Sequence, residues 1–112
     1  MRIAFTAKGP EWDSLMDPRF GRTQFIVIYD EENKTLTHFD NSQSVNDAHG
    51  AGTATVQKIF DLKPDIIITG NGPGTNAAHA LEQLSVKIFV DAYEMTVKQA
   101  YELFKKGKLK EL

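Results

Sequence analysis

The sequence predicts an α/β fold, built as a single domain over residues 1–112. Two expected strands, 24–30 and 65–69, contain the consecutive apolar runs 25–29 and 66–68, and a strand that is apolar on both faces belongs in the middle of a covered sheet. The expected elements begin with three strands joined as a meander. Three helices then alternate with two further strands, and a helical crossover makes the strands that it joins parallel. The pattern therefore favours a mixed sheet flanked by helices.

The first half of the chain is expected to supply the meander. Residues 3–5 are apolar and predict a short first strand, while 24–30 predict the second. The connection over 7–23 is longer than a hairpin needs, and connections of this length are usually functional or mobile. Residues 31–34 predict a hairpin turn before a third strand over 35–39. Because polar residues interrupt that strand, we expect it at an edge of the sheet.

The second half is expected to alternate helix and strand. Residues 50–52 open a helix that runs to Leu62, with Val56, Ile59 and Phe60 on its expected buried side. The helix stops there because a Lys-Pro pair follows, and the residue before proline is disfavoured in a helix. The apolar run after this pair predicts the fourth strand.

The last expected elements carry the clearest local signals. Asn76 is a plausible cap for a helix whose alanines and leucines recur at helical spacing. A fifth strand over 87–90 ends before Asp91. Thr96 and Gln99 have the spacing of a capping box, which predicts the start of the last helix. A glycine stops that helix, and the lysines around it are typical of a solvated helix end.

This topology brings four segments to one edge of the sheet. The carboxyl ends of the first, third, fourth and fifth strands lie there, together with the start of the second. Residues 19–22, the loop 40–52, the loop 70–75 and Asp91 must therefore converge. Ligands of α/β sheets bind at this edge, where the strand order reverses. We expect the functional site there.

Composition excludes several classes of protein. A net charge of −2 and a pI near 5.9 argue against a dedicated nucleic-acid binder, which needs a strongly basic face. The absence of cysteine excludes disulfides and thiolate-held zinc or iron–sulfur sites of the usual kind. The first residues contain only a short apolar run, so no signal peptide or membrane span is expected. A cytoplasmic protein with neither nucleic-acid nor membrane partners is the expectation.

Two of the three arginines lie close together in the long connection. Arg19 and Arg22 flank a Phe-Gly pair, and rigid guanidinium groups suit anionic oxygens and other anions. The alternative is a turn in which these arginines pair with Asp17 and Asp13. Spacing alone does not decide between an anion site and an internal ion pair.

The other candidate chemistry is weaker. A two-metal nuclease needs clustered carboxylates, but the first strand carries no acid, and Asp65 and Asp91 lie at opposite ends of their strands. The glycine-rich loop 70–74 lacks the residues of a phosphate-binding P-loop or a dinucleotide fingerprint. It fits either an anion-binding nest of backbone N–H groups or a tight turn that needs glycine for positive φ.

The three histidines differ in their expected positions. His38 belongs to the expected edge strand, and His79 lies off the apolar stripe of its helix. His49 sits in an HGAG turn at the ligand edge. It is therefore the favoured metal ligand or hydrogen-bond donor.

Several motifs together resemble a known family. DPRFGR at 17–22 precedes an apolar strand ending in aspartate, and the chain also has RIAFT at 2–6, HGAG at 49–52, DIIITGNGPG at 65–74 and a closing helix. In these features the whole chain resembles the dinitrogenase iron–molybdenum cofactor biosynthesis family, which includes nitrogenase accessory proteins that carry the cofactor or its precursor. The resemblance implies a ribonuclease-H-like fold with five strands in the order 3-2-1-4-5, the second antiparallel, and three flanking helices.

The resemblance also implies a cargo, an anionic molybdenum- and iron-containing metal–sulfur cluster bound without covalent attachment. Cofactor carriers of this kind typically have a histidine immediately before the Phe-Gly pair, where this chain has Arg19, and arginine cannot coordinate a metal. Capture by charge, by backbone N–H groups and by His49 as metal ligand is therefore expected, with no catalysis. Phe20 is expected as a core anchor and Gly21 as the turn. The expected binding residues are Arg19, Phe20, Gly21, Arg22, His49, Gly50, Gly52, Gly70, Asn71, Gly72 and Gly74.

Two alternatives use the same features differently. The same edge suits a small anion or a phosphorylated metabolite. The lysine-rich C-terminus or the exposed third strand suits docking of another protein, such as a cluster donor or acceptor.

Overall fold

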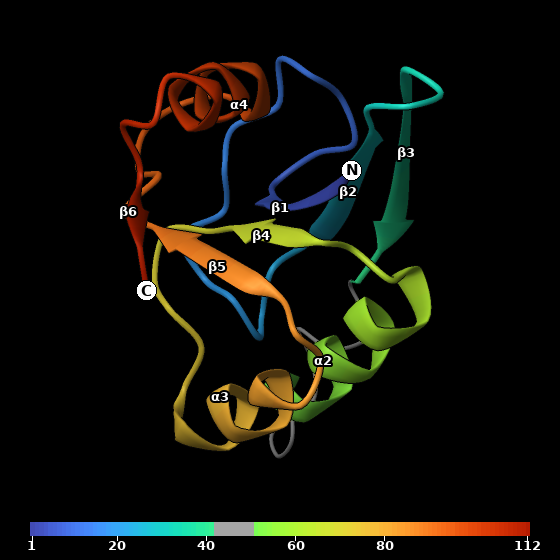
Figure 1. Ribbon diagram of the computed structural model, residues 1–112, viewed down its shortest axis with the longest axis vertical. Coiled ribbons are helices and arrows are strands. Elements are labelled where there is room, and N and C mark those ends of the chain that lie inside the picture. Colours follow the sequence, from blue (N-terminus) through green and yellow to red (C-terminus); the bar gives the residue numbers. More distant parts are fainter. Residues whose placement is uncertain (42–50) are drawn as a thin grey trace.

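A computed structural model describes residues 1–41 and 51–112, and in them the chain forms one mixed sheet between two helical layers (Figure 1). The strand order is β3-β2-β1-β4-β5-β6. The strands are β1 (Arg2–Ala7), β2 (Phe25–Asp30), β3 (Thr35–Asp40), β4 (Ile66–Ile68), β5 (Lys87–Val90) and β6 (Lys110–Glu111). The helices of the described residues are α2 (Ala51–Leu62), α3 (Thr75–Glu82) and α4 (Val97–Lys105).

The register places the first strand at the centre of the sheet. Ile3 lies opposite Tyr29 of the antiparallel β2 and opposite Ile66 of the parallel β4. β5 is parallel to β4, and β3 is antiparallel to β2. The predicted order of the first five strands and the antiparallel second strand are therefore confirmed. The carboxyl ends of the four strands expected at one edge do lie there together.

The two faces of the sheet bury different cores. Phe5, Val27 and Ile68 point to the face covered by α4, where Val97 and Ala100 pack on them. The opposite face is covered by α2 and α3 (Figure 1) and buries a second apolar cluster. Its members are Ala4, Phe20, Ile26, Ile28, Val56, Ile59, Ile67, Ala77 and Leu81. Alternate residues of the central strands serve the two layers, which explains why these strands are apolar at consecutive positions.

The prediction of five strands is wrong because the chain end adds a sixth. β6 pairs antiparallel with β5, with Val90 opposite Lys110, and the Leu112 N–H donates to the Ile88 carbonyl at 2.7 Å. The two residues of β6 are exposed and charged, so no apolar pattern marks them. Gly107 has a φ of 69°, and this left-handed turn directs the chain back along the sheet edge.

Two local predictions also differ from the structure. Phe60 was expected on the buried side of α2 but is 52% exposed, whereas Val56 and Ile59 of the same helix are buried in the core. α3 begins at Thr75 with Gly74 as its N-cap, so the cap predicted at Asn76 is wrong. The capping box of Thr96 and Gln99 is confirmed by both of its hydrogen bonds.

The helices in the described ranges are all too short or too polar to cross a bilayer. The cytoplasmic location expected from the sequence stays a prediction.

Candidate functional site

The structure brings the arginine loop (residues 17–22) and the glycine loop (residues 70–74) together around one cleft. The cleft is open, has a volume of about 400 Å³, and lies at the carboxyl edge of the central strands. Its lining residues are Arg19, Phe20, Gly21, Arg22, Asn71, Gly72 and Gly74. All seven are residues that the sequence predicts for the site, and their binding role stays a prediction.

A buried carboxylate organises the arginine loop. Asp17 is fully buried, and its side chain accepts from the Arg19 Nε and Nη2 atoms at 3.0 Å each. The same carboxylate accepts from the backbone N–H groups of Arg19 and Gln24, at 3.0 and 3.1 Å. A hydrogen bond from the Thr6 hydroxyl to the Asp17 carbonyl, 2.8 Å long, fastens the loop to β1. A buried charge needs such partners, so the loop conformation is built around Asp17.

This ion pair changes the electrostatics expected of the cleft. The hydrogen bond to Asp17 raises the pKa of the Arg19 guanidinium, so Arg19 stays protonated, although partial burial opposes the shift. The positive charge of Arg19 is largely offset by the carboxylate 3.0 Å away. The ion-pair alternative is thus correct for Arg19. Arg22 is exposed and contributes a further positive charge at the cleft.

Phe20 and Gly21 attach the arginine loop to the helical layer formed by α2 and α3. The Phe20 side chain is 4% exposed and packs in the core with Ile26 and Val56, as the anchor predicted for it. The Gly21 carbonyl accepts from the Thr55 hydroxyl of α2 at 2.7 Å. The cleft wall therefore rests on both the sheet and α2.

The glycine loop closes against the arginine loop by a short backbone hydrogen bond. The Asn71 N–H donates to the Pro18 carbonyl at 2.7 Å. A Cβ atom on Gly70 would lie 2.7 Å from the Pro18 Cα and 2.9 Å from the Tyr93 Cε1, so only glycine allows this approach. None of Gly70, Gly72 and Gly74 has a positive φ, and the tight-turn explanation for these glycines is wrong.

The end of the glycine loop is the N-terminus of α3. Gly74 is the N-cap residue, with φ −66° and ψ 173°, and as a glycine it has no side chain that could cap the helix. Among the described parts of the chain, no atom lies within 4 Å of the position that a Cβ on Gly74 would take, and Gly74 lines the cleft. Uncapped N–H groups at a helix start favour anions.

Tyr93 belongs to this site and was missed in the sequence. Its hydroxyl donates to the Asn71 Oδ1 at 2.5 Å, and its ring packs against Gly70. Tyr93 follows β5 by three residues, at the edge where Asp91 was expected. Asp91 lies there too but does not line the cleft, and its N–H donates to the Gly70 carbonyl at 2.9 Å. The predicted convergence at this edge was the signal that could have indicated Tyr93.

Some of the residues predicted around His49 lie outside the described parts of the chain. His49 and Gly50 lie outside the described residues, and Gly52 lies in the first turn of α2. His38 is exposed on β3 with its ring against Phe25. Across residues 1–41 and 51–112, His, Cys, Asp and Glu side chains form no group of three or more able to hold a metal ion.

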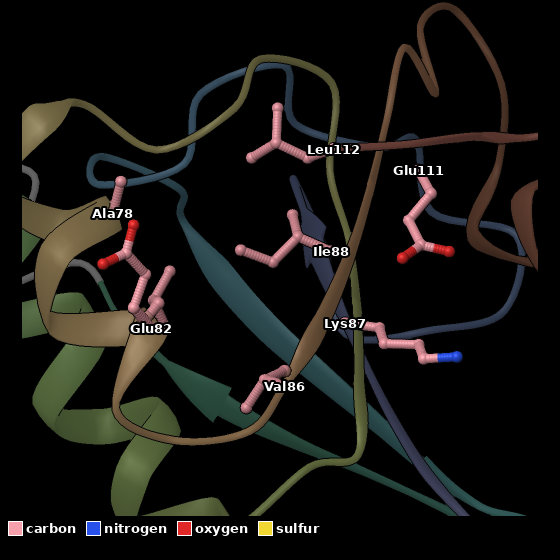
Figure 2. A pocket seen from close by; sticks show the side chains of 8 residues that line it. Ala78, Glu82, Val86, Lys87, Ile88, Glu111 and Leu112 are labelled. Atoms are coloured by element: carbon pink, nitrogen blue, oxygen red, sulfur yellow. The ribbon is translucent and has the colours of Figure 1, made fainter.

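A second cavity lies beside the site and differs in character. This groove has a volume of about 280 Å³ and lies between α3, β5 and the chain end. Figure 2 shows Ala78, Ile88 and Leu112 among its lining side chains. The Leu112 methyl groups lie 3.7 Å from the position that a Cβ on Gly72 would take. Leu112, which lines the groove, therefore lies against the outer side of the glycine loop.

Comparison with known proteins gives three findings. The family model described as "dinitrogenase iron-molybdenum cofactor" matches residues 1–107. The apo form of the orange protein from Desulfovibrio gigas is 35% identical with a TM-score of 0.92, over 99% of this chain and 92% of that one. A putative NifB protein from Thermotoga is 32% identical with a TM-score of 0.84, over the same shares of the two chains. Among curated proteins, no match was found.

Proposed function

This chain belongs to the dinitrogenase iron–molybdenum cofactor family, and on that premise we propose that it binds and delivers an anionic metal–sulfur cluster of the molybdenum- and iron-containing kind. The observation that carries the proposal is the cleft between the arginine loop and the glycine loop. Its volume of about 400 Å³ lies in the range of small-molecule sites. The similarity to a protein solved in an apo form supports a bound group as well.

The chemistry of the cleft determines how a cluster would be held. The described lining side chains include no thiolate, imidazole or carboxylate, so they offer no ordinary ligand to a metal ion. They offer the charge of Arg22, the remaining guanidinium donors of Arg19 and the backbone of the glycine loop. Such groups suit the outer sulfide or oxo atoms of a cluster that keeps its own inorganic ligands. His49 remains the proposed direct metal ligand.

Arg19 and Arg22 have different proposed roles. Arg19 shapes the loop through Asp17, and its net contribution of positive charge is small because that carboxylate offsets it. We assign Arg22 the contact with the cargo, because it is exposed and lines the cleft. A change at Arg19 should affect stability as well as binding, because Arg19 donates two hydrogen bonds to the buried Asp17 carboxylate.

The first experiment is metal analysis with a visible absorption spectrum on protein purified without oxygen and without chelators. We expect molybdenum or iron and charge-transfer bands, or uptake of tetrathiomolybdate by the colourless protein. Arg22→Ala should weaken that uptake about tenfold, which is typical of a charged hydrogen bond. Lys98→Ala, which removes an exposed cation on α4 in the other layer, is the matched control and should bind normally. A metal-free protein that takes up no thiometallate would refute the proposal.

His49 needs its own variant. His49→Ala should remove metal-dependent absorption bands while leaving weak capture of the anion, if imidazole coordinates the cluster. Unchanged bands in this variant would remove His49 from the ligand set.

A smaller anion is the second candidate, and the N-terminus of α3, whose N-cap residue Gly74 has no side chain, favours it. Backbone N–H groups at a helix start bind phosphate well. A protein that stays colourless and gains thermal stability with phosphate or a phosphorylated metabolite would support this candidate in place of the cluster.

Three further aspects belong to the same proposal. We propose that the protein performs no catalysis and exchanges its cargo with a donor or acceptor protein. The exposed edge strand β3 is the candidate docking element, since an unpaired strand edge can pair with another chain. We also propose a ribonuclease-H-like classification, supported by the observed order of the first five strands and the antiparallel second strand.

A further inference from the structure

Tyr93 and Asn71 form a pair at the wall of the cleft. The tyrosine hydroxyl donates to the Asn71 Oδ1 at 2.5 Å, although the two residues are 22 positions apart. Asn71 lines the cleft and Tyr93 does not. Tyr93 therefore contacts Asn71 from the side that faces away from the cleft.

This hydrogen bond fixes the orientation of the Asn71 amide. An asparagine side chain carries an acceptor oxygen and an NH₂ donor on opposite branches, and a flip of the amide exchanges them. Because Oδ1 accepts from Tyr93, the amide presents Nδ2 away from the tyrosine. No acceptor for Nδ2 is found in the ranges 1–41 and 51–112. The amide thus offers an N–H donor rather than an oxygen for an incoming group.

The segment that carries Tyr93 is held in an unusual conformation. Asp91 and Glu94 have φ values of 67° and 53°, in the left-handed region that non-glycine residues seldom adopt. Backbone hydrogen bonds from Asp91 to the Gly70 carbonyl and from Ala92 to the Thr69 carbonyl hold it against the glycine loop. Strained conformations persist where the surrounding structure over-determines them, and they are frequent at ligand sites. Here the strained segment delivers the tyrosine ring to Gly70 and its hydroxyl to Asn71.

We propose that Tyr93 is a positioning residue that orients the Asn71 amide so that its Nδ2 donates to an anion in the cleft. The inference rests on the proposed function and deepens it, since it names a donor and the group that orients it. The class of ligand selected is an anion with exposed sulfide or oxo acceptor atoms. A ligand that presents hydrogen-bond donors would instead face the Nδ2 donor of Asn71, which cannot accept a hydrogen bond.

A double-mutant cycle on the full chain tests the proposal, with tetrathiomolybdate as the probe and its Kd as the measured quantity. Tyr93→Phe removes only the hydroxyl and should weaken binding about five- to tenfold. Asn71→Ala should weaken binding by at least as much. In the Asn71→Ala background, Tyr93→Phe should have no further effect, because the amide that it orients is gone. A purely structural tyrosine would instead give additive losses.

Tyr101→Phe is the matched control. It also removes one hydroxyl hydrogen bond, to Glu31 on the α4 side of the sheet, and should leave the Kd unchanged. Equal loss of affinity in Tyr101→Phe and Tyr93→Phe would overturn the inference by showing a general effect on stability.

The outcomes separate this inference from the proposed function. Thiometallate binding with additive losses overturns the inference and leaves the proposed function intact. Binding of inorganic phosphate but not of thiometallate, with the same non-additive cycle, overturns the proposed cargo and supports the role of Tyr93. Wild-type protein that binds neither anion overturns both.

Discussion

Gly70→Ala probes the contact on which the cleft depends. The added methyl group would lie 2.7 Å from the Pro18 Cα and 2.9 Å from the Tyr93 Cε1. Both distances are shorter than van der Waals contact, and the first involves backbone. The tyrosine ring can rotate away, but Pro18 is held by the 2.7 Å hydrogen bond from Asn71. We therefore expect the glycine loop to separate from the arginine loop.

The cost of this substitution follows from two contributions. Overpacking of a buried site costs about 1–3 kcal/mol, and loss of the hydrogen bond between Asn71 and Pro18 adds about 1 kcal/mol. Restriction of the unfolded chain by alanine returns about 0.5 kcal/mol. We expect a net destabilisation of about 2–3 kcal/mol, which corresponds to a fall of roughly 10 °C in Tm for a domain of this size.

Urea denaturation followed by circular dichroism measures this free energy of unfolding. Gly72→Ala is the matched control, because the nearest described neighbours of its methyl group would be the side chains of Leu112 and Val90, at the ordinary contact distances of 3.7 and 3.8 Å. That control should be within about 0.5 kcal/mol of wild type or slightly stabilised. Gly70→Ala should also lose affinity for tetrathiomolybdate. If Gly70→Ala is as stable as Gly72→Ala, the contact between the two loops is not the reason for glycine at this position.

Three further predictions concern stability. Arg19→Ala should destabilise the protein by about 2 kcal/mol in urea denaturation, since it removes two donors from the buried Asp17 carboxylate, and a neutral result would refute the ion pair as the organiser of the loop. Burial and the hydrogen bond to Glu31 raise the pKa of Tyr101 to about 12, so the folded protein keeps a proton that the unfolded chain loses from about pH 10. Stability should therefore fall between about pH 10 and about pH 12, and Tyr101→Phe should lose less stability in that interval; equal losses would contradict the assignment. Thr96→Ala removes the cap of α4 and should cost about 1 kcal/mol, whereas an unchanged urea midpoint would show that the cap contributes nothing.

The sequence was sufficient to place the two loops at one edge of the sheet. That prediction needed only the alternation of strands and helices and the rule that crossovers join parallel strands. It did not need any side-chain contact. The structure accordingly shows a cleft lined by residues from 19–22 and 71–74.

The charge of the cleft could not be predicted in the same way. Arg19 had two possible partners, an external anion or an internal carboxylate, and the spacing to Asp17 fits both. The burial of Asp17 decides the matter, because a fully buried carboxylate requires donors and Arg19 supplies two of them. This burial results from the packing of the loop in the folded protein, so the sequence of residues 17–22 does not show it.

The sequence by itself determined the elements whose signals are local. Consecutive apolar residues gave the central strands, and Thr96 with Gln99 gave the start of α4, because the hydrogen bonds involved join residues three positions apart. Only the tertiary structure decided β6, the pairing of Arg19 with a buried Asp17, and the position of Tyr93 behind Asn71. β6 consists of two exposed residues that form a strand only because the edge of β5 is available to them. Tyr93 meets Asn71 only because two parallel strands end side by side, so this contact depends on the complete sheet.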